Sequence, residues 1–166
     1  MNVFAVHRDP VRAARALCDR HVVKMTLETA QILCSAARAR LGQPAPYRPT
    51  HAEHPCVIWA AARRANWEWL VRHGLALADE YARRFGRVHR SRAVIARVGR
   101  RGPAPDGRRR QAFAQVMPER YRGRDPIAAY RRYYAAEKAR FATWRAPSRP
   151  PRWWPGSDAG GAMRAG

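Results

Sequence analysis

Apolar residues recur at spacings of three and four along most of this chain, and a few clusters of proline and glycine divide the pattern into segments. No segment sustains the alternation of apolar and polar residues that marks a half-buried strand. The pattern therefore predicts an all-α fold. A length of 166 residues is typical of one compact domain.

Two RDP motifs mark the starts of helices. In each motif an aspartate, Asp9 or Asp125, is expected to cap the helix, and the proline after it suits the first turn. We expect two long helices, a short one and a C-terminal one, over residues 10–41, 55–85, 91–98 and 126–141. Without a break the second would span about 45 Å, so a break near Gly74 is expected.

The remaining segments are rich in helix breakers. We expect a folded domain over residues 1–154, in which residues 99–110 form a mobile basic loop of arginine, glycine and proline. Residues 155–166 are rich in glycine and alanine and are expected to be a disordered tail.

The chain is strongly basic. It holds 33 lysine and arginine residues against 12 aspartate and glutamate residues, which gives a formal charge of +21. Such a surface attracts polyanions, and nucleic acid is the leading candidate. A codon bias toward arginine is the alternative, since Lys24 and Lys138 are the sole lysines. That bias does not explain why acidic residues are so few.

Cysteine usage and hydropathy indicate the compartment. Cys18, Cys34 and Cys56 are an odd number at wide spacing, which argues against a disulfide framework and favours a reducing compartment. No run of 18 apolar residues and no signal-peptide core is present. We therefore expect a soluble, cytoplasmic, nucleoid-associated protein with no membrane partner.

The clearest chemical cluster lies in the first predicted helix. His21, Lys24 and Glu28 follow one another at spacings of three and four, along the edge of the apolar stripe. Glu28 beside apolar surface could act as an acid or base. Equally, Lys24 and Glu28 could form a helix ion pair, with His21 hydrogen-bonded at the edge of the core. The spacing leaves both interpretations open.

A second polar cluster precedes the second long helix. Thr50, His51 and His54 are expected to cap that helix or to contact phosphate. Together with Cys56 they match no standard zinc-ligand spacing, so we predict no metal site. A metal-dependent nuclease or hydrolase that uses His51, His54 and His73 remains an alternative.

Two further groups leave a choice between packing and binding. Asn66, His73 and Glu80 recur at intervals of seven and form a polar seam, which is a buried hydrogen-bond network or a binding face. Trp153 and Trp154 lie in a basic, proline-rich segment, where they could stack on bases or pack back onto the domain.

Three segments carry a resemblance to a known family. The stretch DRHVVKMTLE, residues 19–28, is similar to a family helix in which a histidine precedes the catalytic glutamate by seven positions, and the match falls on His21 and Glu28. Residues 68–85 and 117–144 align with two later family segments in the same order. In these segments the chain resembles the pyrimidine-dimer DNA glycosylases of T-even phages, the endonuclease V type.

The resemblance implies a small all-α enzyme that excises a base of a UV-induced dimer and nicks the resulting abasic site, without a cofactor. In that family the terminal α-amine forms a Schiff base with C1′ and the glutamate assists. Glu28, His21 and the amine of Met1 would take the catalytic roles. Asn2 is too large for ordinary methionine removal, so we expect Met1 to remain. An α-amine with a pKa of about 7.7 to 8.0 is partly neutral at physiological pH.

The chain also departs from the family. Leu27 and Gln31 stand where the family has arginines beside the catalytic glutamate, which fits a modified pyrimidine as well as a dimer. We expect a monomer that binds double-stranded DNA; a non-catalytic basic nucleic-acid-binding protein is the other class. The candidates for DNA contact are Asn2, Arg20, Lys24, Thr50, His51, His54, Asn66, His73, Arg84, His89, Trp153 and Trp154.

Overall fold

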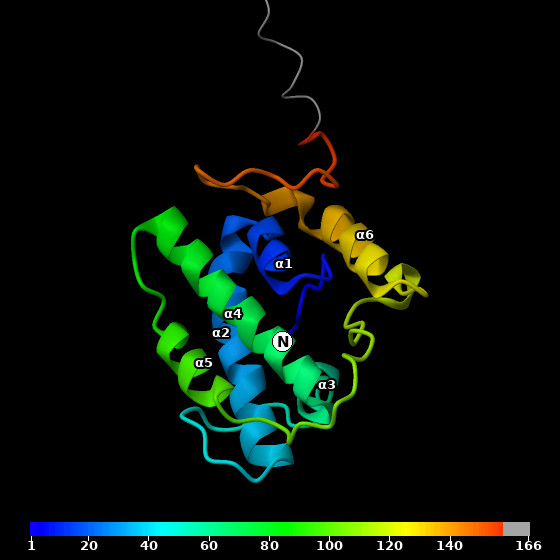
Figure 1. Ribbon diagram of the computed structural model, residues 1–166. Coiled ribbons are helices and arrows are strands. Elements are labelled where there is room, and N and C mark those ends of the chain that lie inside the picture. Colours follow the sequence, from blue (N-terminus) through cyan, green and yellow to red (C-terminus); the bar gives the residue numbers. More distant parts are fainter. Residues whose placement is uncertain (158–166) are drawn as a thin grey trace, which may run out of the picture.

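A computed structural model of the protein describes residues 1–157, and all regular structure within them is helical, as predicted. The α-helices are α1 (Pro10–Ala16), α2 (Asp19–Ser35), α3 (Pro55–Ala62), α4 (Arg64–Phe85), α5 (Ser91–Gly99) and α6 (Pro126–Lys138). Short π- and 3-10 turns form η1 (Ala36–Arg40), η2 (Glu119–Tyr121) and η3 (Ala139–Phe141). Figure 1 shows α4 crossing in front of α2, with α5 on one side and α6 on the other. The predicted tail lies mostly outside the described residues.

Both RDP motifs start helices in the predicted way. The Asp9 side chain accepts a hydrogen bond from Arg12 N at 2.8 Å, and the Asp125 side chain accepts one from Ile127 N at 2.9 Å. In each helix the proline occupies the first turn, where its missing N–H is not needed. The motif therefore predicts the starts of α1 and α6 correctly.

The first predicted helix is divided into three pieces, which the sequence did not predict. Leu17 and Cys18 are extended and separate α1 from α2, and η1 continues α2 to Arg40. Distant segments satisfy the backbone groups that the break frees. Tyr134 Oη accepts from Cys18 N at 3.0 Å, and the buried Arg84 donates to the Leu17 carbonyl at 2.8 Å.

The second predicted helix breaks at Arg63, and the expected break at Gly74 is wrong. Arg63 is extended, with ψ of 149°, and separates α3 from α4. Gly74 lies inside α4, at a point where that helix packs closely on α2. A Cβ at this position would lie 2.5 Å from Cγ2 of Thr29. Glycine here permits a close approach of two helices and causes no bend.

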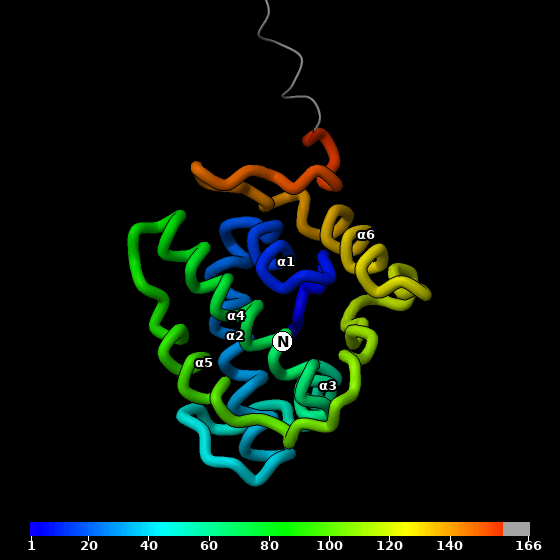
Figure 2. Tube along the Cα trace, in the orientation of Figure 1, coloured from blue at the N-terminus to red at the C-terminus, as the bar shows by residue number. Residues whose placement is uncertain are grey.

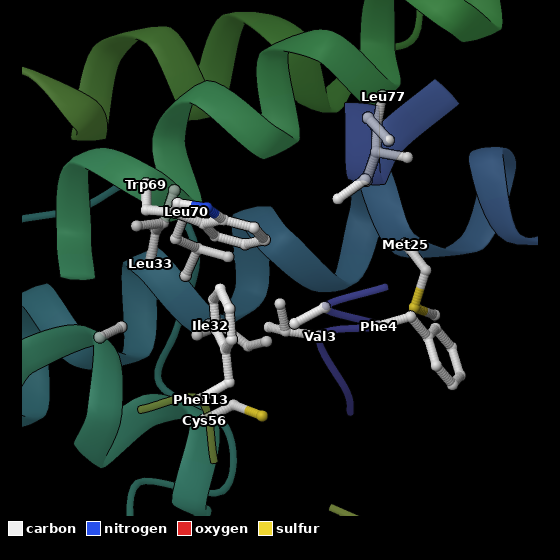
Figure 3. Close-up of a cluster of buried hydrophobic side chains, with 14 of the residues drawn as sticks. Val3, Phe4, Met25, Ile32, Leu33, Cys56, Trp69, Leu70, Leu77 and Phe113 are labelled. Atoms are coloured by element: carbon white, nitrogen blue, oxygen red, sulfur yellow. The ribbon is translucent and has the colours of Figure 1, made fainter. Parts of the chain in front are cut away.

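The core lies between α2 and α4, and the N-terminal segment runs into it. Val3, Phe4, Ala5 and Val6 are all buried, although they belong to no helix. Figure 3 shows Val3 and Phe4 among side chains from α2, α3 and α4. In the view of Figure 2 the amino terminus lies near the centre of the picture, and Met1 and Asn2 are half-buried. Residues 3–6 are therefore part of the interior.

The predicted basic loop, residues 99–110, is without helix beyond Gly99, but it is anchored at Gly102. Gln43 makes two hydrogen bonds of 3.0 Å with the backbone of Gly102, and the Trp67 ring packs where a Cβ would be. The mobility of the rest of the loop stays a prediction. No helix in residues 1–157 is both long and apolar enough to cross a membrane.

Candidate active site

The predicted cluster on α2 lines a cavity of about 190 Å³ that the amino terminus also reaches. The helix directs His21, Lys24 and Glu28 to one side because they are spaced by three and four. Phe4 comes from the N-terminal segment, and α6 closes the far side. The cavity is lined by Met1, Asn2, Phe4, His21, Lys24, Met25, Glu28, Tyr133 and Lys138.

Glu28 is 9% exposed and meets the start of the chain directly. Asn2 N donates a hydrogen bond of 2.8 Å to its Oε2 atom, and Lys24 Nζ lies 3.6 Å from Oε1. The predicted ion pair of Lys24 and Glu28 is therefore present. It does not exclude a reactive role, because the carboxylate faces the cavity and the amino-terminal residues.

Asn2 is held by its side-chain amide, which uses both its donor and its acceptor. Asn2 Nδ2 donates to the Val116 carbonyl at 2.7 Å, and Oδ1 accepts from Val3 N at 2.7 Å and from Tyr130 Oη at 3.1 Å. The shorter hydroxyl side chain of a serine or threonine at this position could not reach both Val116 and Tyr130. Sequence reasoning missed Val116 and Tyr130, because no local pattern links them to residue 2.

The segment before α3 surrounds Met1. Thr50 Oγ1 lies 3.9 Å from the Met1 sulfur, and the Thr50 backbone is tied to the Ser35 hydroxyl on α2 by two hydrogen bonds of 2.9 Å. His54 caps α3, as predicted, by accepting from Cys56 N at 3.2 Å, and its ring lies close enough to Met1 for the charge and the backbone of that residue to influence its pKa. These contacts hold the first residue in place.

Burial and charge set the protonation of this segment. Burial, together with the positive charge of the amino terminus, lowers the pKa of His54 below its usual value. Burial raises the pKa of the Cys56 thiol to about 12. His54 is therefore neutral and Cys56 is a thiol at neutral pH. His51 is exposed, with a left-handed φ of 51°, and it does not line the cavity.

His21 lies on the wall of the cavity as a neutral ring. Its Nδ1 atom is 2.7 Å from Tyr134 Oη, and it stacks on Phe4 at 4.6 Å between ring centroids. Burial, and then the charges of Lys138, Lys24 and Arg20, lower its pKa to about 4. One ring nitrogen is thus fixed by Tyr134, as expected for a histidine at the edge of the core.

The far wall of the cavity carries Tyr133 and Lys138 from α6. Lys138 Nζ lies 4.7 Å from the centroid of the Tyr133 ring and 3.3 Å from its hydroxyl. Our sequence reasoning did not predict either residue as part of the site. Two signals pointed to Lys138: it is one of two lysines in an arginine-rich chain, and it lies in the segment 117–144 that resembles the family.

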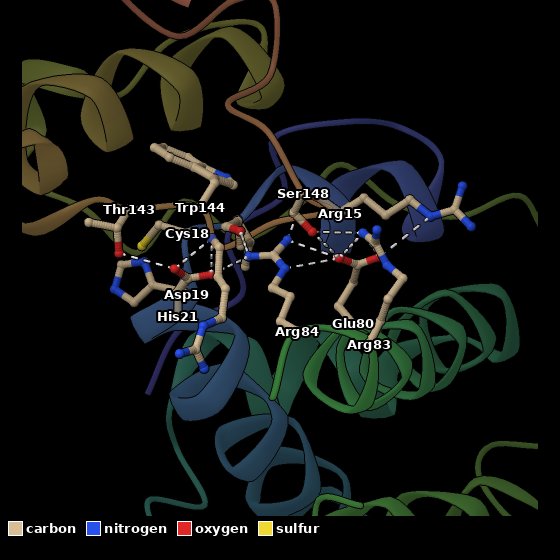
Figure 4. A network of polar contacts seen from close by, with 12 residues as sticks. Arg15, Cys18, Asp19, His21, Glu80, Arg83, Arg84, Thr143, Trp144 and Ser148 are labelled. Atoms are coloured by element: carbon tan, nitrogen blue, oxygen red, sulfur yellow. Dashed lines mark hydrogen bonds and ion pairs between the residues drawn. The ribbon is translucent and has the colours of Figure 1, made fainter. Parts of the chain in front are cut away.

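Arg84, a predicted DNA contact, belongs instead to a buried network with Glu80 and Asp19. Figure 4 shows this network between the α1–α2 break and α4. The Arg84 side chain is 0% exposed and lies 3.0 Å from Glu80 and 3.1 Å from Asp19. Glu80 also accepts from Arg83 at 2.6 Å and from Ser148 at 3.2 Å. Arg84 stabilises the fold and cannot reach a duplex.

Asn66 and His73 are also buried, so they are not DNA contacts. Asn66 exchanges hydrogen bonds of 2.8 and 2.9 Å with Gln111. His73 is 1% exposed, stacks on Trp69 at 5.0 Å, and neither of its ring nitrogens has a partner. Burial lowers its pKa to about 3. Asn66, His73 and Glu80, the three residues of the predicted seam, therefore lie in separate environments and do not form one hydrogen-bond network.

The other predicted contacts lie outside the cavity. Arg20 is exposed and sits over the Phe141 ring at 4.9 Å, and half-buried His89 accepts a hydrogen bond of 3.2 Å from Ser91 N at the start of α5. Trp153 and Trp154 pack edge-on against Tyr134 at 6.2 and 6.0 Å. The tryptophan pair thus follows the packing interpretation. No group of three metal-ligating side chains occurs in the part of the chain that the structure describes.

Comparison with known proteins bears on the part of this site that the N-terminal segment and α2 supply. The sequence profile of the pyrimidine dimer DNA glycosylases matches residues 1–94, which is more than half of the 166 residues and includes Met1, His21 and Glu28. Neither a curated protein nor a solved structure gives a match. The family match confirms the resemblance in α2, and the chain belongs to the pyrimidine dimer DNA glycosylase family.

Proposed function

We propose that this protein is a DNA glycosylase with AP lyase activity, which acts as a monomer on damaged or modified pyrimidines in double-stranded DNA. Membership of the family supports pyrimidine-dimer repair in general. The observation that carries the finer proposal is the meeting of Glu28 with the start of the chain, where Asn2 N and Glu28 Oε2 are 2.8 Å apart. Nucleophile and carboxylate would thus share one cavity.

The proposed reaction has two stages. The neutral α-amine attacks C1′ of a nucleotide that has left the stack, and the C1′–N bond breaks as the base leaves with the electron pair and takes up a proton. The amine then loses a proton, the C1′–O4′ bond opens, and a Schiff base remains. Loss of a proton from C2′ finally breaks the bond between C3′ and its phosphate oxygen.

Several residues in and beside the cavity have roles that their surroundings support. Glu28, partly shielded from water, stabilises the developing positive charge at C1′ and accepts the proton of the amine. His21, neutral and fixed by Tyr134, bounds the space for the sugar. Lys138 and exposed Arg20 neutralise phosphates on either side of the flipped nucleotide.

The position of the amine depends on whether Met1 is retained. With Met1 present, the amine lies one residue beyond the Asn2 nitrogen, on the side of Thr50 and His54. Without Met1, the nitrogen of Asn2 would itself be the amine, 2.8 Å from Glu28. We propose Met1 as the nucleophile, because Asn2 is a poor substrate for methionine removal.

Cleavage of defined duplexes tests the function. Four duplexes carry one pyrimidine dimer, one oxidised pyrimidine, one abasic site or no damage. The proposal expects cleavage of the abasic duplex and of one damaged duplex, with a covalent adduct when borohydride is present. The duplex with an oxidised pyrimidine is included because Leu27 and Gln31, in place of the family's arginines, fit a modified pyrimidine as well as a dimer. Binding of all four duplexes without cleavage or adduct would leave a non-catalytic DNA-binding protein.

A further inference from the structure

The two lysines of the chain line the same cavity. Of the 33 basic residues, all but Lys24 and Lys138 are arginine, and the lining of this cavity contains both lysines and no arginine. Two basic residues drawn at random from this chain would nearly always be arginines. Positive charge alone therefore does not explain the choice, because arginine supplies it everywhere else in the protein.

Lysine differs from arginine in a way that suits chemistry. The ammonium group is compact and can release a proton, whereas a guanidinium remains protonated in proteins. A residue that only attracts phosphate would serve equally well as arginine. The presence of lysine in place of arginine at this cavity thus indicates a need for a primary amine.

Lys24 is the lysine placed to take part in the reaction. Its side chain is 63% exposed and reaches over the cavity, so that Nζ lies 3.6 Å from Oε1 of Glu28. The other oxygen of Glu28 accepts from Asn2 N at 2.8 Å. The carboxylate therefore lies between the lysine and the start of the chain, and a proton received on the Asn2 side can leave on the Lys24 side.

We propose that Lys24 is a catalytic residue that works with Glu28 as a proton relay. This role rests on the glycosylase reaction proposed above. When the Schiff base forms, Glu28 takes the proton that the attacking amine loses, and Lys24 gives a proton to O4′ as the C1′–O4′ bond breaks. The proton on Glu28 then passes to the neutral Lys24, which restores both groups. No proton is gained or lost overall, and no oxidant or metal is needed.

Exchange of lysine for arginine tests this role. Lys24→Arg keeps the charge, so we expect duplex binding and its salt dependence to stay within about twofold of the unchanged protein. Single-turnover formation of the borohydride-trapped adduct on an abasic duplex is expected to fall about 100-fold. Arg12→Lys, the reverse exchange at an exposed arginine of α1, serves as the matched control and should change neither quantity.

Chemical rescue separates the amine from any structural role. Lys24→Cys should be inactive, and alkylation with bromoethylamine, which rebuilds a side chain of nearly the same length ending in a primary amine, should restore at least a tenth of the rate. The three native cysteines are buried, and treatment of the unchanged protein controls for their alkylation. Alkylation should also return the pH dependence of the rate of adduct formation to that of the unchanged protein.

The outcomes separate this inference from the proposed function. If Lys24→Arg forms the adduct at the normal rate, the relay is wrong and the glycosylase remains. If the alkylated Lys24→Cys protein binds DNA but stays inactive, the relay is again wrong. If the unchanged protein forms no adduct with any duplex, the proposed function fails and the relay fails with it. If the adduct maps to Lys24, the lysine is the nucleophile and both proposals are overturned.

Discussion

The same sequence pattern, a histidine followed seven positions later by a glutamate, occurs in both long helices and produces two different environments. His21 and Glu28 lie on α2, and His73 and Glu80 lie on α4. Glu28 and Glu80 are 9% and 4% exposed. Glu80 is surrounded by arginines and Ser148, whereas Glu28 meets a backbone N–H, one lysine and a cavity.

The difference teaches that burial and spacing do not decide the role of a carboxylate; its partners do. Arg84 uses Glu80 as a counterion while it also fills the break between α1 and α2, so that pair holds the fold together. The partners of Glu28 are the backbone N–H of Asn2 and the ammonium group of Lys24, and its carboxylate also lines the cavity. We therefore expect changes at Glu28 to affect reaction rate and changes at Glu80 to affect stability.

The largest effect is expected from Glu28→Gln. The amide has the same shape and can still accept from Asn2 N, but it carries no charge and takes up no proton. Single-turnover cleavage of an abasic duplex should fall at least about 100-fold, while the unfolding midpoint in urea stays nearly constant. Glu53→Gln, at a glutamate whose side chain is 84% exposed, is the control. A loss below tenfold would remove Glu28 from the reaction.

Glu80→Gln is expected to show the opposite profile. Its removal leaves the guanidinium of Arg84, which is 0% exposed, with Asp19 as its remaining counterion. The free energy of unfolding should fall by about 3 kcal/mol in urea titrations, and cleavage per folded molecule should persist. Glu68→Gln, which removes an exposed pair with Arg64, should change it by about 0.5 kcal/mol or less. Equal effects of both variants would contradict the contrast.

The two histidines sharpen the same comparison through pH. Burial lowers the pKa of His73 to about 3, so the unfolded chain takes up a proton below about pH 6.5 that the folded chain refuses. Stability is therefore lost as pH falls from 6.5 toward 3. Relative to the unchanged protein, His73→Leu should gain about 2 kcal/mol between pH 7 and pH 5 in urea titrations. If the difference in unfolding free energy between the two proteins were the same at pH 7 and pH 5, His73 would take up its proton in the folded protein as readily as in the unfolded chain.

The smallest effect is expected from His54→Asn. Asparagine can still cap α3, but its shorter side chain does not reach the backbone of Met1. Adduct formation should slow by about tenfold, because the amine is held less firmly, while thermal stability is kept. His54→Ala loses both contacts and should lower the two quantities together. A normal rate with asparagine would show that the cap alone matters.

Local sequence signals predict the parts of the fold that are set locally. The RDP motifs fix the starts of α1 and α6, and the spacing of His21, Lys24 and Glu28 places them on one side of α2. The break at Leu17 and Cys18 was not predictable, because its backbone groups are satisfied by residues more than sixty positions away.

The same limit applies to the site. Arginine is ordinarily a surface residue, so nothing in the sequence reveals that Arg84 is buried. The anchoring of Asn2 depends on Val116 and Tyr130, and Lys138 reaches the cavity from α6. Each of these contacts joins segments that are distant in the sequence, and tertiary packing decides them.

The most direct test of the shared role of Glu28 and the amino terminus is the location of the borohydride-trapped adduct. The chain has three primary amines, which are the amino terminus, Lys24 and Lys138. Proteolysis and mass analysis of the trapped complex should find the sugar remnant on the α-amine of the peptide that begins the chain. A remnant on either lysine, or no adduct on any duplex, would contradict the proposed reaction.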